Sequence, residues 1–264
     1  METEEKGGKG DRRRGKGSLY IVGIGPGGTD DLTGRARDAL SRSECIVGYT
    51  RYVGLLSPLV EGKEVHTTGM TREVERCAKA LELAREGKTV AIVSSGDAGI
   101  YGMAGLIFQL APEDTDITIE TIPGVPAFVA AASMLGAPLM HDFASISLSD
   151  LLTPREKIVE RVEAAARADF VIIFYNPKST KRTEGLPEAV EIVRRFRKAD
   201  TPAGIVRNAS RKEEECVLTT LAEIDRYYDR VDMLSLVIIG NSTTFKKGEW
   251  MITPRGYKDL GEPF

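Results

Sequence analysis

A short apolar run that ends in a glycine-rich turn constrains the fold of this 264-residue chain most strongly. Residues 89–93 have the length and the β-branched composition of a buried strand. The turn at residues 94–102 contains three glycines and leads into residues 103–110, for which the apolar pattern predicts a helix. Such a turn at the carboxyl end of a strand lets a ligand approach the backbone. A tight turn that merely needs small residues is the alternative.

The same alternation of strand and helix runs through the first half of the chain and predicts a largely parallel sheet. Strands are predicted at residues 18–23, 45–47, 63–66, 89–93 and 117–122. Helices are predicted around Ala36 to Leu40 and at residues 52–56, 71–86, 103–110 and 127–135. In the helix at residues 71–86, Val74, Cys77, Ala78, Leu81 and Ala84 form the apolar face.

The pattern changes after residue 135, so we place a domain boundary near residues 138–142. The second half contains predicted strands at residues 143–147, 170–175, 202–206, 216–219 and 234–239, and an edge strand at 250–253. Helices are predicted at residues 154–166, 186–197, with a basic outer face, and 221–228. The predicted fold class is α/β, with a disordered tail (1–17), an N-terminal α/β domain (18–138) and a C-terminal α/β domain (139–264).

Composition narrows the classes of partner. A net charge of −3 argues against nucleic acid. No apolar stretch approaches the roughly 18 residues of a membrane helix, and the charged N-terminus has no secretory signal, so no membrane partner is expected. Cys45, Cys77 and Cys216 are too scattered for a disulfide framework or a metal site. We therefore expect a cytoplasmic protein without a bound metal.

The first glycine loop could indicate a nicotinamide-dependent oxidoreductase, because its pattern is found in dinucleotide-binding sites. Gly23, Gly25 and Gly28 satisfy the pattern GxGxxG. A dinucleotide site also needs an acidic residue at the end of the second strand, where residues 48–50 are Gly-Tyr-Thr. Pro26 further removes a backbone donor that a pyrophosphate would use. The oxidoreductase is disfavoured but stays an alternative.

A different reading accounts for more of the chain. Residues 22–28, 95–102 and 122–127 resemble, in order and spacing, three motifs of the tetrapyrrole (corrin/porphyrin) methyltransferase family. Residues 141–143, 147–154, 174–179, 206–211 and 239–243 resemble the C17-methyltransferase branch of that family. The resemblance covers residues 18 to about 254, and Ala98 departs from it where many relatives have proline.

The resemblance implies two α/β domains with S-adenosyl-L-methionine in the cleft between them, usually in a homodimer. The implied cofactor contacts in the first half are Pro26, Gly96, Asp97, Ala98, Ile100, Tyr101, Pro126 and Ala127. Those in the second half are Tyr175, Asn176, Asn208, Ala209, Asn241, Ser242 and Thr243. Methyl displacement needs an in-line geometry rather than a metal. The Asp97 carboxylate can accept hydrogen bonds from the ribose or the amino group, or it can cap a helix.

The implied substrate is a small-molecule tetrapyrrole with several acetate and propionate groups, which arginine and lysine side chains suit. Candidates in or beside predicted loops are Arg51, Lys178, Lys181, Arg207 and Arg211. For each of them, a solvated surface charge is the alternative. The branch contracts the ring after methylation, which calls for a positioned acid or base. Candidates for that role are His141, Asp142, Ser149 and Asp150, with a packed histidine and a capping aspartate as alternatives.

The resemblance thus implies a C17-methyltransferase of cobalamin biosynthesis that acts on precorrin-3B or cobalt-factor III. Another corrinoid-pathway methyltransferase, acting at a different ring carbon, is the nearest alternative. A non-catalytic corrinoid- or nucleotide-binding protein would keep the same fold.

Overall fold

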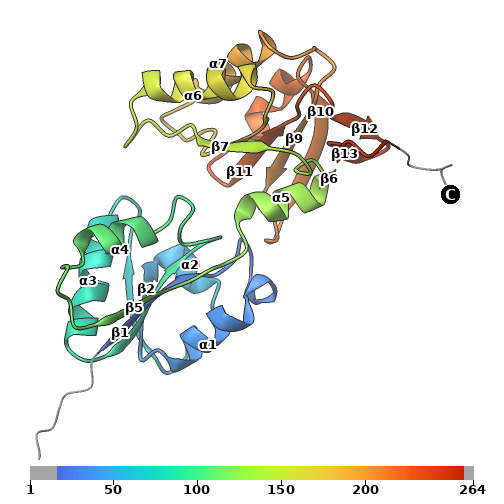
Figure 1. The fold of residues 1–264 in the computed structure, drawn as a ribbon. Helices are drawn as coiled ribbons and strands as arrows, with labels where there is room; N and C mark the ends of the chain where they lie inside the picture. The colour runs from blue at the N-terminus through green and yellow to red at the C-terminus, as the bar shows by residue number, and fades with distance from the viewer. Residues whose placement is uncertain (1–16, 259–264) are drawn as a thin grey trace, which may run out of the picture. The chain divides into compact units, whose positions relative to one another are not determined.

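The computed structural model describes residues 17–258 of the chain, which pack as two compact units. The first unit runs to Gly25 and resumes at Leu32–Gly124, while the second comprises Pro26–Asp31 and the chain from Val125 onward. Each unit is built on its own sheet (Figure 1). Packing groups residues 125–138 with the second unit, and the boundary after residue 138 stays a prediction.

The predicted tail of residues 1–17 lies outside the described residues except for Gly17. This glycine is buried, and its carbonyl accepts a hydrogen bond from the Thr118 backbone N–H at 3.1 Å. A Cβ on Gly17 would lie 1.8 Å from the Ala84 carbonyl oxygen, so only glycine fits. Gly17 is therefore part of the packed structure and not of the tail that the sequence predicts.

The sheet of the first unit is parallel throughout, in the strand order β3-β2-β4-β1-β5. Its strands are β1 (Ser18–Gly23), β2 (Cys45–Tyr49), β3 (Glu64–Thr68), β4 (Thr89–Ser94) and β5 (Thr118–Ile122). Its helices are α1 (Gly34–Arg42), α2 (Thr50–Gly54), α3 (Glu73–Arg85) and α4 (Ala104–Leu110). The parallel α/β prediction for this half is confirmed.

Helices cover both faces of this sheet, which explains why its central strands are apolar without alternation. On one face, Leu19 and Ile92 pack against α3 and α4. On the other face, Val22 and Val93 pack against α1 and α2 (Figure 1). With both faces covered, the carboxyl edge of the sheet is left to the loops that follow the strands.

The sheet of the second unit is mixed, in the order β10-β9-β11-β8-β7. β7 and β8 are parallel, and β11 runs antiparallel between β8 and β9. Its strands are β7 (Phe143–Ser147), β8 (Val171–Tyr175), β9 (Pro202–Arg207), β10 (Glu215–Thr220) and β11 (Ser235–Ile239). Its helices are α5 (Ala127–Leu135), α6 (Arg155–Arg167) and α7 (Gly185–Arg194), with 3-10 segments η1 (Thr29–Asp31) and η2 (Ile224–Arg230).

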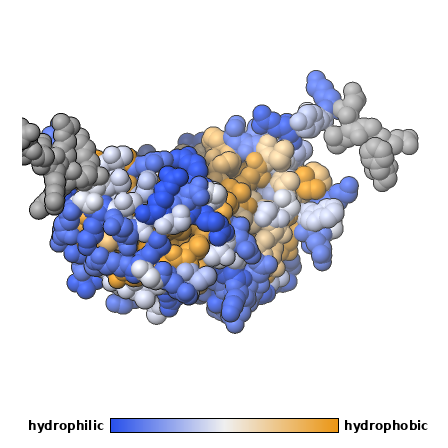
Figure 2. Space-filling view, turned by 90° about the horizontal axis from the view of Figure 1, so that it is seen from below, coloured by the Kyte–Doolittle hydropathy of each residue, from blue (hydrophilic) through white to orange (hydrophobic). Residues whose placement is uncertain are grey.

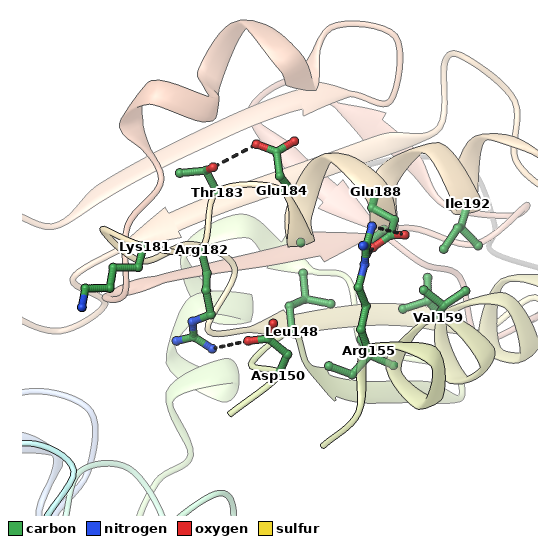
Figure 3. A pocket seen from close by; sticks show the side chains of 14 residues that line it. Leu148, Asp150, Arg155, Val159, Lys181, Arg182, Thr183, Glu184, Glu188 and Ile192 are labelled. Carbon is green, nitrogen blue, oxygen red and sulfur yellow. Dashed lines mark hydrogen bonds and ion pairs between the residues drawn. The ribbon is translucent and has the colours of Figure 1, made fainter. Parts of the chain in front are cut away.

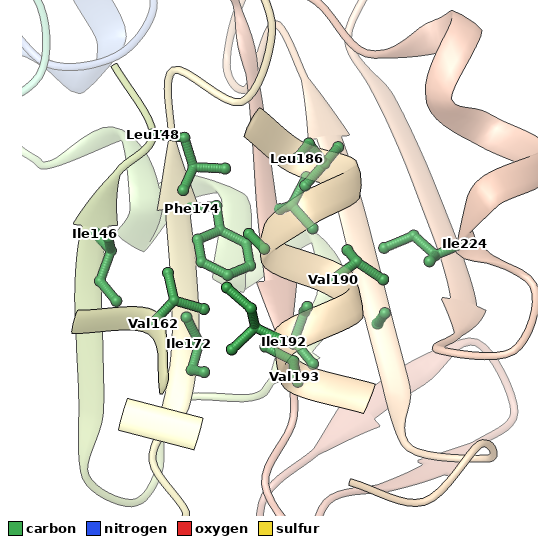
Figure 4. Packing of buried hydrophobic residues seen from close by; sticks show 14 of the residues in the cluster. Ile146, Leu148, Val162, Ile172, Phe174, Leu186, Val190, Ile192, Val193 and Ile224 are labelled. Carbon is green, nitrogen blue, oxygen red and sulfur yellow. The ribbon is translucent and has the colours of Figure 1, made fainter. Parts of the chain in front are cut away.

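The core of the second unit lies between its sheet and the helices α6 and α7. Phe174 of β8, fully buried, packs there beside Val162 of α6 and Val190 of α7 (Figure 4). α5 packs against the sheet closely enough that a Cβ on Gly204 would lie 2.3 Å from the Leu135 side chain. The direction in which each strand crosses this core sets the edge of the sheet at which its loop emerges.

Three details differ from the sequence prediction. Residues 250–253 do not form an edge strand: β13 (Trp250–Ile252) is the middle strand of a small sheet, between β12 (Phe245–Lys247) and β6 (Gly136–Ala137). α7 ends at Arg194, three residues short of the prediction, and Arg197 beyond it is buried rather than on a basic outer face. In α3, Val74 is 60% exposed, and Arg76 lies inside instead.

Hydrophobic residues also remain at the surface. Figure 2 shows apolar side chains exposed among hydrophilic ones on one face of the molecule. Leu152, in the loop before α6, is 98% exposed. No helix in residues 17–258 combines the length and the apolar character that a membrane span requires.

Candidate functional site

The glycine-rich turn after β4 forms a backbone cradle with the loop after β1. Gly25 N–H donates to the Gly96 carbonyl at 3.1 Å, and Gly96 N–H donates to the Gly25 carbonyl at 2.7 Å. Both residues have positive φ angles, 77° and 68°, which glycine adopts without strain. The two loops are therefore held together by main chain alone, with no side chain at the point of contact.

Asp97 joins a third segment to this cradle. Its Oδ1 accepts a hydrogen bond from Gly99 N–H at 2.8 Å, and its Oδ2 accepts one from Gly124 N–H at 3.0 Å. A Cβ on Gly124 would lie 2.2 Å from the Gly96 carbonyl oxygen, so the segments meet at backbone distance. Asp97 thus ties two loops together and does not cap α4, which begins after Met103.

The remaining residues of the turn differ in what they present to a ligand. The Ala98 methyl group is fully buried in the core against α3 and α4, so only its backbone is left for a ligand. Ile100 is half-buried, and Tyr101 is 53% exposed with a φ angle of 53°. A left-handed tyrosine is uncommon and marks a turn whose shape is fixed by its surroundings.

In the second unit, the carboxyl ends of β7, β8 and β9 lie at one edge of the sheet because these strands run in the same direction. Tyr175 and Asn176 emerge there from β8, and Asn208 and Ala209 emerge from β9. Asn176 Nδ2 donates to Ser147 Oγ at 2.9 Å. Asn176 and Asn208 both have left-handed φ angles, 51° and 54°, which asparagine tolerates.

Three further predicted cofactor residues join this edge. Phe128 N–H, in the first turn of α5, donates to the Tyr175 hydroxyl at 3.3 Å, which places the preceding Pro126 and Ala127 beside β8. The Pro26 carbonyl accepts a hydrogen bond from Arg211 Nε at 2.6 Å. Pro26 is thereby fixed to the loop that follows β9.

Not all predicted residues reach this edge. β11 is antiparallel to β8, so the turn of Asn241, Ser242 and Thr243 emerges at the opposite edge. There Ser242 Oγ donates to Asp169, the residue two positions before β8, at 2.6 Å. Asn241 Oδ1 accepts from Thr243 N–H at 3.0 Å. These three residues close their own turn and are separated from Asn176 by the length of a five-residue strand, about 15 Å.

The four acid–base candidates are divided in the same way. His141 and Asp142 precede β7, and the Asp142 carbonyl accepts from Val171 N–H at the start of β8. His141 Nδ1 accepts from Asp142 N–H at 2.9 Å. Ser149 and Asp150 follow β7 instead and share the edge with Asn176. The structure therefore does not bring the four together.

Arg182 is a residue that sequence reasoning missed at this edge. It donates to Ser149 Oγ, and its Nη1 lies 3.5 Å from Asp150 Oδ1. Figure 3 shows the two side chains facing each other at the rim of a cavity of about 230 Å³. Leu148 and Val162 form part of its apolar floor. In the sequence, only its position directly after the candidate Lys181 could have suggested Arg182.

The five predicted substrate cations have different surroundings. Lys178 Nζ donates to the Tyr228 carbonyl at 2.9 Å, and Arg211 is engaged with Pro26. Arg207 Nε lies 2.8 Å from Asp232. Burial alone would raise the pKa of Asp232, but the hydrogen bonds from Arg207, Leu234 N–H and Ser235, together with the Arg207 charge, outweigh it and leave this pKa below its usual range. Arg51 and Lys181 are exposed.

Cys45 and Cys77 are not activated as nucleophiles. Burial raises the pKa of the Cys45 and Cys77 thiols to about 11, so both are protonated at neutral pH. Within residues 17–258, no three His, Cys, Asp or Glu side chains are grouped so as to hold a metal ion.

Comparison with known proteins places these features in a family. The family model of the tetrapyrrole (corrin/porphyrin) methylases matches residues 18–225. A probable cobalt-factor III C(17)-methyltransferase of Salmonella typhimurium is 52% identical over 240 residues, which are 90% of this chain and 99% of that protein. The cobalt-factor III methyltransferase of Priestia megaterium is 48% identical over 92% of this chain. This chain spans 46%, about half, of the length of the Priestia protein.

Solved structures agree. The crystal structure of the methyltransferase CobJ superposes with a TM-score of 0.84 at 37% identity, covering 90% of this chain and 100% of that one. The cobalt precorrin-4 methyltransferase CbiF superposes with a TM-score of 0.67 at 25% identity, over 84% of this chain and 94% of that one.

Proposed function

The chain belongs to the tetrapyrrole (corrin/porphyrin) methylases, and on that premise we propose that it methylates C17 of cobalt-factor III with S-adenosyl-L-methionine in cobalamin biosynthesis. The observation that carries the proposal is 52% identity to the Salmonella protein along nearly the whole of both chains. The names of the relatives in Salmonella and Priestia favour cobalt-factor III over precorrin-3B, the other substrate that the sequence leaves open.

The cradle fits a methyl donor that carries a ribose and an amino acid. Each Asp97 carboxylate oxygen accepts one backbone N–H and has capacity for a second hydrogen bond, from a ribose hydroxyl or an amino group. The absence of a side chain at Gly124 lets its loop meet the Gly96 carbonyl at backbone distance, which holds Asp97 in place. When bound, a sulfonium donor supplies an activated methyl group that must lie nearly in line with the acceptor carbon. We assign Ile100 and Tyr101 to the wall of this site.

The cofactor contacts predicted for the second unit stay predictions. Tyr175, Asn176, Asn208 and Ala209 share one sheet edge, and Pro26, Pro126 and Ala127 lie beside it. Asn241, Ser242 and Thr243 lie at the other edge, and their side chains are engaged in a turn. Substitution of Asn208 should weaken donor binding more than substitution of Asn241.

For the ring contraction, we propose that Ser149, Asp150 and Arg182 position and move the proton. The methylated ring must lose its meso carbon as part of an acetyl group, which needs an acid or base beside the macrocycle. Asp150 is nearly half exposed, and Arg182 holds it beside Ser149. The Asp150 carboxylate is thereby held in one place, where it can exchange a proton with a bound macrocycle.

Incubation with labelled S-adenosyl-L-methionine and either cobalt-factor III or precorrin-3B tests the proposal. We expect labelled product from cobalt-factor III, with the methyl group at C17 by NMR and a contracted ring by mass and absorption spectrum. Methylation at another ring carbon would support the neighbouring corrinoid methyltransferases. Failure to label any early corrin intermediate would contradict the proposal.

Calorimetry separates the remaining alternatives. S-adenosyl-L-homocysteine should bind and NAD should not, which distinguishes a methyltransferase from a nicotinamide oxidoreductase. Tight binding of the homocysteine product without turnover of any tetrapyrrole would favour a binding protein. A homodimer and a cytoplasmic location stay predictions; light scattering of the purified protein measures the first.

A further inference from the structure

Arg76 is an arginine of α3 that points into the first unit and is only 3% exposed. Its Nε donates to Thr68 Oγ1 at 3.0 Å, and its Nη2 donates to the Gly69 carbonyl at 2.9 Å. Its Nη1 lies 3.6 Å from the sulfur of Met103. The guanidinium carbon lies 5.9 Å from the centre of the Tyr49 ring. All four partners are uncharged.

The charge of this guanidinium is not compensated within the described part of the chain. No ion pair with a carboxylate involves Arg76 there, whereas Arg197, also 3% exposed in its side chain, has Asp169 at 3.2 Å. A buried charge is costly unless it is paired. A thioether sulfur is a weak hydrogen-bond acceptor. A negatively charged acceptor in place of the sulfur would therefore form a stronger hydrogen bond with Nη1 and compensate the charge of the guanidinium.

Arg76 also lies at the edge of the sheet where ligands bind in many parallel α/β folds. Tyr49 ends β2, Thr68 ends β3, and Met103 directly follows the glycine-rich turn. These residues surround the guanidinium at the carboxyl edge of a parallel sheet, the usual ligand-binding edge of such folds. Met103 is half-buried and unbranched, so its side chain can change rotamer and expose Nη1.

We propose that Arg76 binds a carboxylate of the ligand, which displaces the Met103 sulfur and accepts a hydrogen bond from Nη1. The proposal rests on the proposed function, which offers two sources of that group: an acid side chain of the macrocycle and the carboxylate of the methyl donor. Both present the same chemistry to the guanidinium.

Binding titrations test the macrocycle as the source. Cobalt-factor III and its methyl ester are titrated into the wild type, R76Q and the control R85Q, which changes an exposed arginine of the same helix. We expect the wild type and R85Q to prefer the free acid by about tenfold, the gain from one charge-assisted hydrogen bond. R76Q should lose that preference.

A second pair of ligands tests the methyl donor as the source. S-adenosyl-L-homocysteine carries the carboxylate, and 5′-methylthioadenosine lacks it. If R76Q loses the preference for the former while discriminating normally between the macrocycle and its ester, the donor supplies the carboxylate. If R76Q keeps both preferences and only its melting temperature falls, Arg76 is structural and the proposal is overturned.

A third variant decides the matter if R76Q does not fold. M103E places a carboxylate within reach of Nη1, so it should keep the fold and abolish the preference for the free acid. Because either ligand can supply the carboxylate, M103E contradicts the proposal if it keeps both the preference for the free acid and the preference for S-adenosyl-L-homocysteine over 5′-methylthioadenosine. These titrations do not depend on turnover, so a failure to methylate cobalt-factor III is distinguishable from a failure of Arg76 to bind a carboxylate.

Discussion

Gly124 is the residue at which the cradle has least room, because a Cβ there would lie 2.2 Å from the Gly96 carbonyl oxygen and 2.6 Å from the Gly23 carbonyl carbon. We expect G124A to force these loops apart and to destabilise the protein by about 1–3 kcal/mol, the usual cost of overpacking. Urea unfolding measures that cost. Titration with S-adenosyl-L-homocysteine should show affinity reduced by at least tenfold, since Asp97 loses its alignment with Gly124 N–H.

G105A is the matched control. Gly105 lies in α4, where a new Cβ meets only the Gln109 side chain at 4.0 Å. The change should stabilise the helix by up to about 1 kcal/mol and leave binding unaltered. If G124A binds S-adenosyl-L-homocysteine as tightly as G105A does, the cradle does not hold the donor.

The buried side chain of Arg197 stabilises the second unit through hydrogen bonds to backbone carbonyls. Its Nη1 donates to the Ala166 carbonyl at 2.6 Å and its Nη2 to the Phe170 carbonyl at 3.1 Å. We expect R197M to remove these hydrogen bonds and the ion pair with Asp169, and to cost about 3–5 kcal/mol in unfolding free energy. R195M, in which the lost arginine is 55% exposed, should change stability by less than about 1 kcal/mol. Equal effects of the two substitutions would mean that burial is not the cause.

The acid stability of the edge strand β3 depends on Glu64. Hydrogen bonds from Lys88, His66 and Cys45 lower the pKa of Glu64 to about 2, from an ordinary value of 4.5. Because the pKa is lowered in the folded protein, the stabilisation is complete above pH 4.5 and is lost as the pH falls towards 2. E64Q should therefore be less stable than the wild type at pH 7, and the difference should shrink between pH 5 and pH 2. Urea unfolding across this range measures it.

E113Q is the control, because Glu113 is exposed in a loop. Its stability should follow that of the wild type from pH 7 to pH 2. A gap between E64Q and the wild type that stayed constant with pH would exclude titration of Glu64 as the source.

The course of β7 separates two pairs of candidate residues by a whole strand. His141 precedes the strand, and Asp150 follows it. If the reaction uses the edge that carries Asn176, D150N should lower turnover by at least tenfold, while H141A should leave it within about twofold. Single-turnover kinetics with cobalt-factor III measures both. If H141A lowered turnover more than D150N, the acid–base group would lie at the opposite edge, which carries His141.

The elements themselves follow closely from the hydrophobic pattern, and their direction does not. Each buried strand is recognisable as a short β-branched run, but nothing in residues 235–239 says that β11 runs antiparallel to β8. That single property sends Asn241 away from Asn176. In α3 the helical period is correct but its phase is not, because Val74 is apolar and exposed while Arg76 is charged and buried. The sequence around a buried arginine that donates hydrogen bonds to distant loops shows the same hydrophobic pattern as the sequence around an exposed arginine.

At the scale of the whole molecule, the family and the glycine cradle could be predicted because they depend on short segments in a fixed order. The residues that would bind the acid groups of a ligand could not be predicted in this way. Lys178, Arg207 and Arg211 precede or follow loops as expected, yet each is engaged by the protein itself. Arg76 and Arg182 became candidates only when the fold showed what surrounds them. Sequence gives the order of the loops, whereas the partner of each side chain depends on tertiary packing.

The assignment of Pro26–Asp31 to the second unit affects how relatives of this protein can be recombined. A Cβ on Gly27 would lie 1.9 Å from the Ser210 carbonyl oxygen, and Arg211 bonds to Pro26, so this hexapeptide is matched to the loop after β9. A chimera with a single crossover at Gly124 would pair the hexapeptide of one parent with the β9 loop of the other. Transplanting residues 26–31 along with the C-terminal portion keeps the two co-adapted pieces from one parent, and such grafts should express and fold where single-crossover hybrids do not.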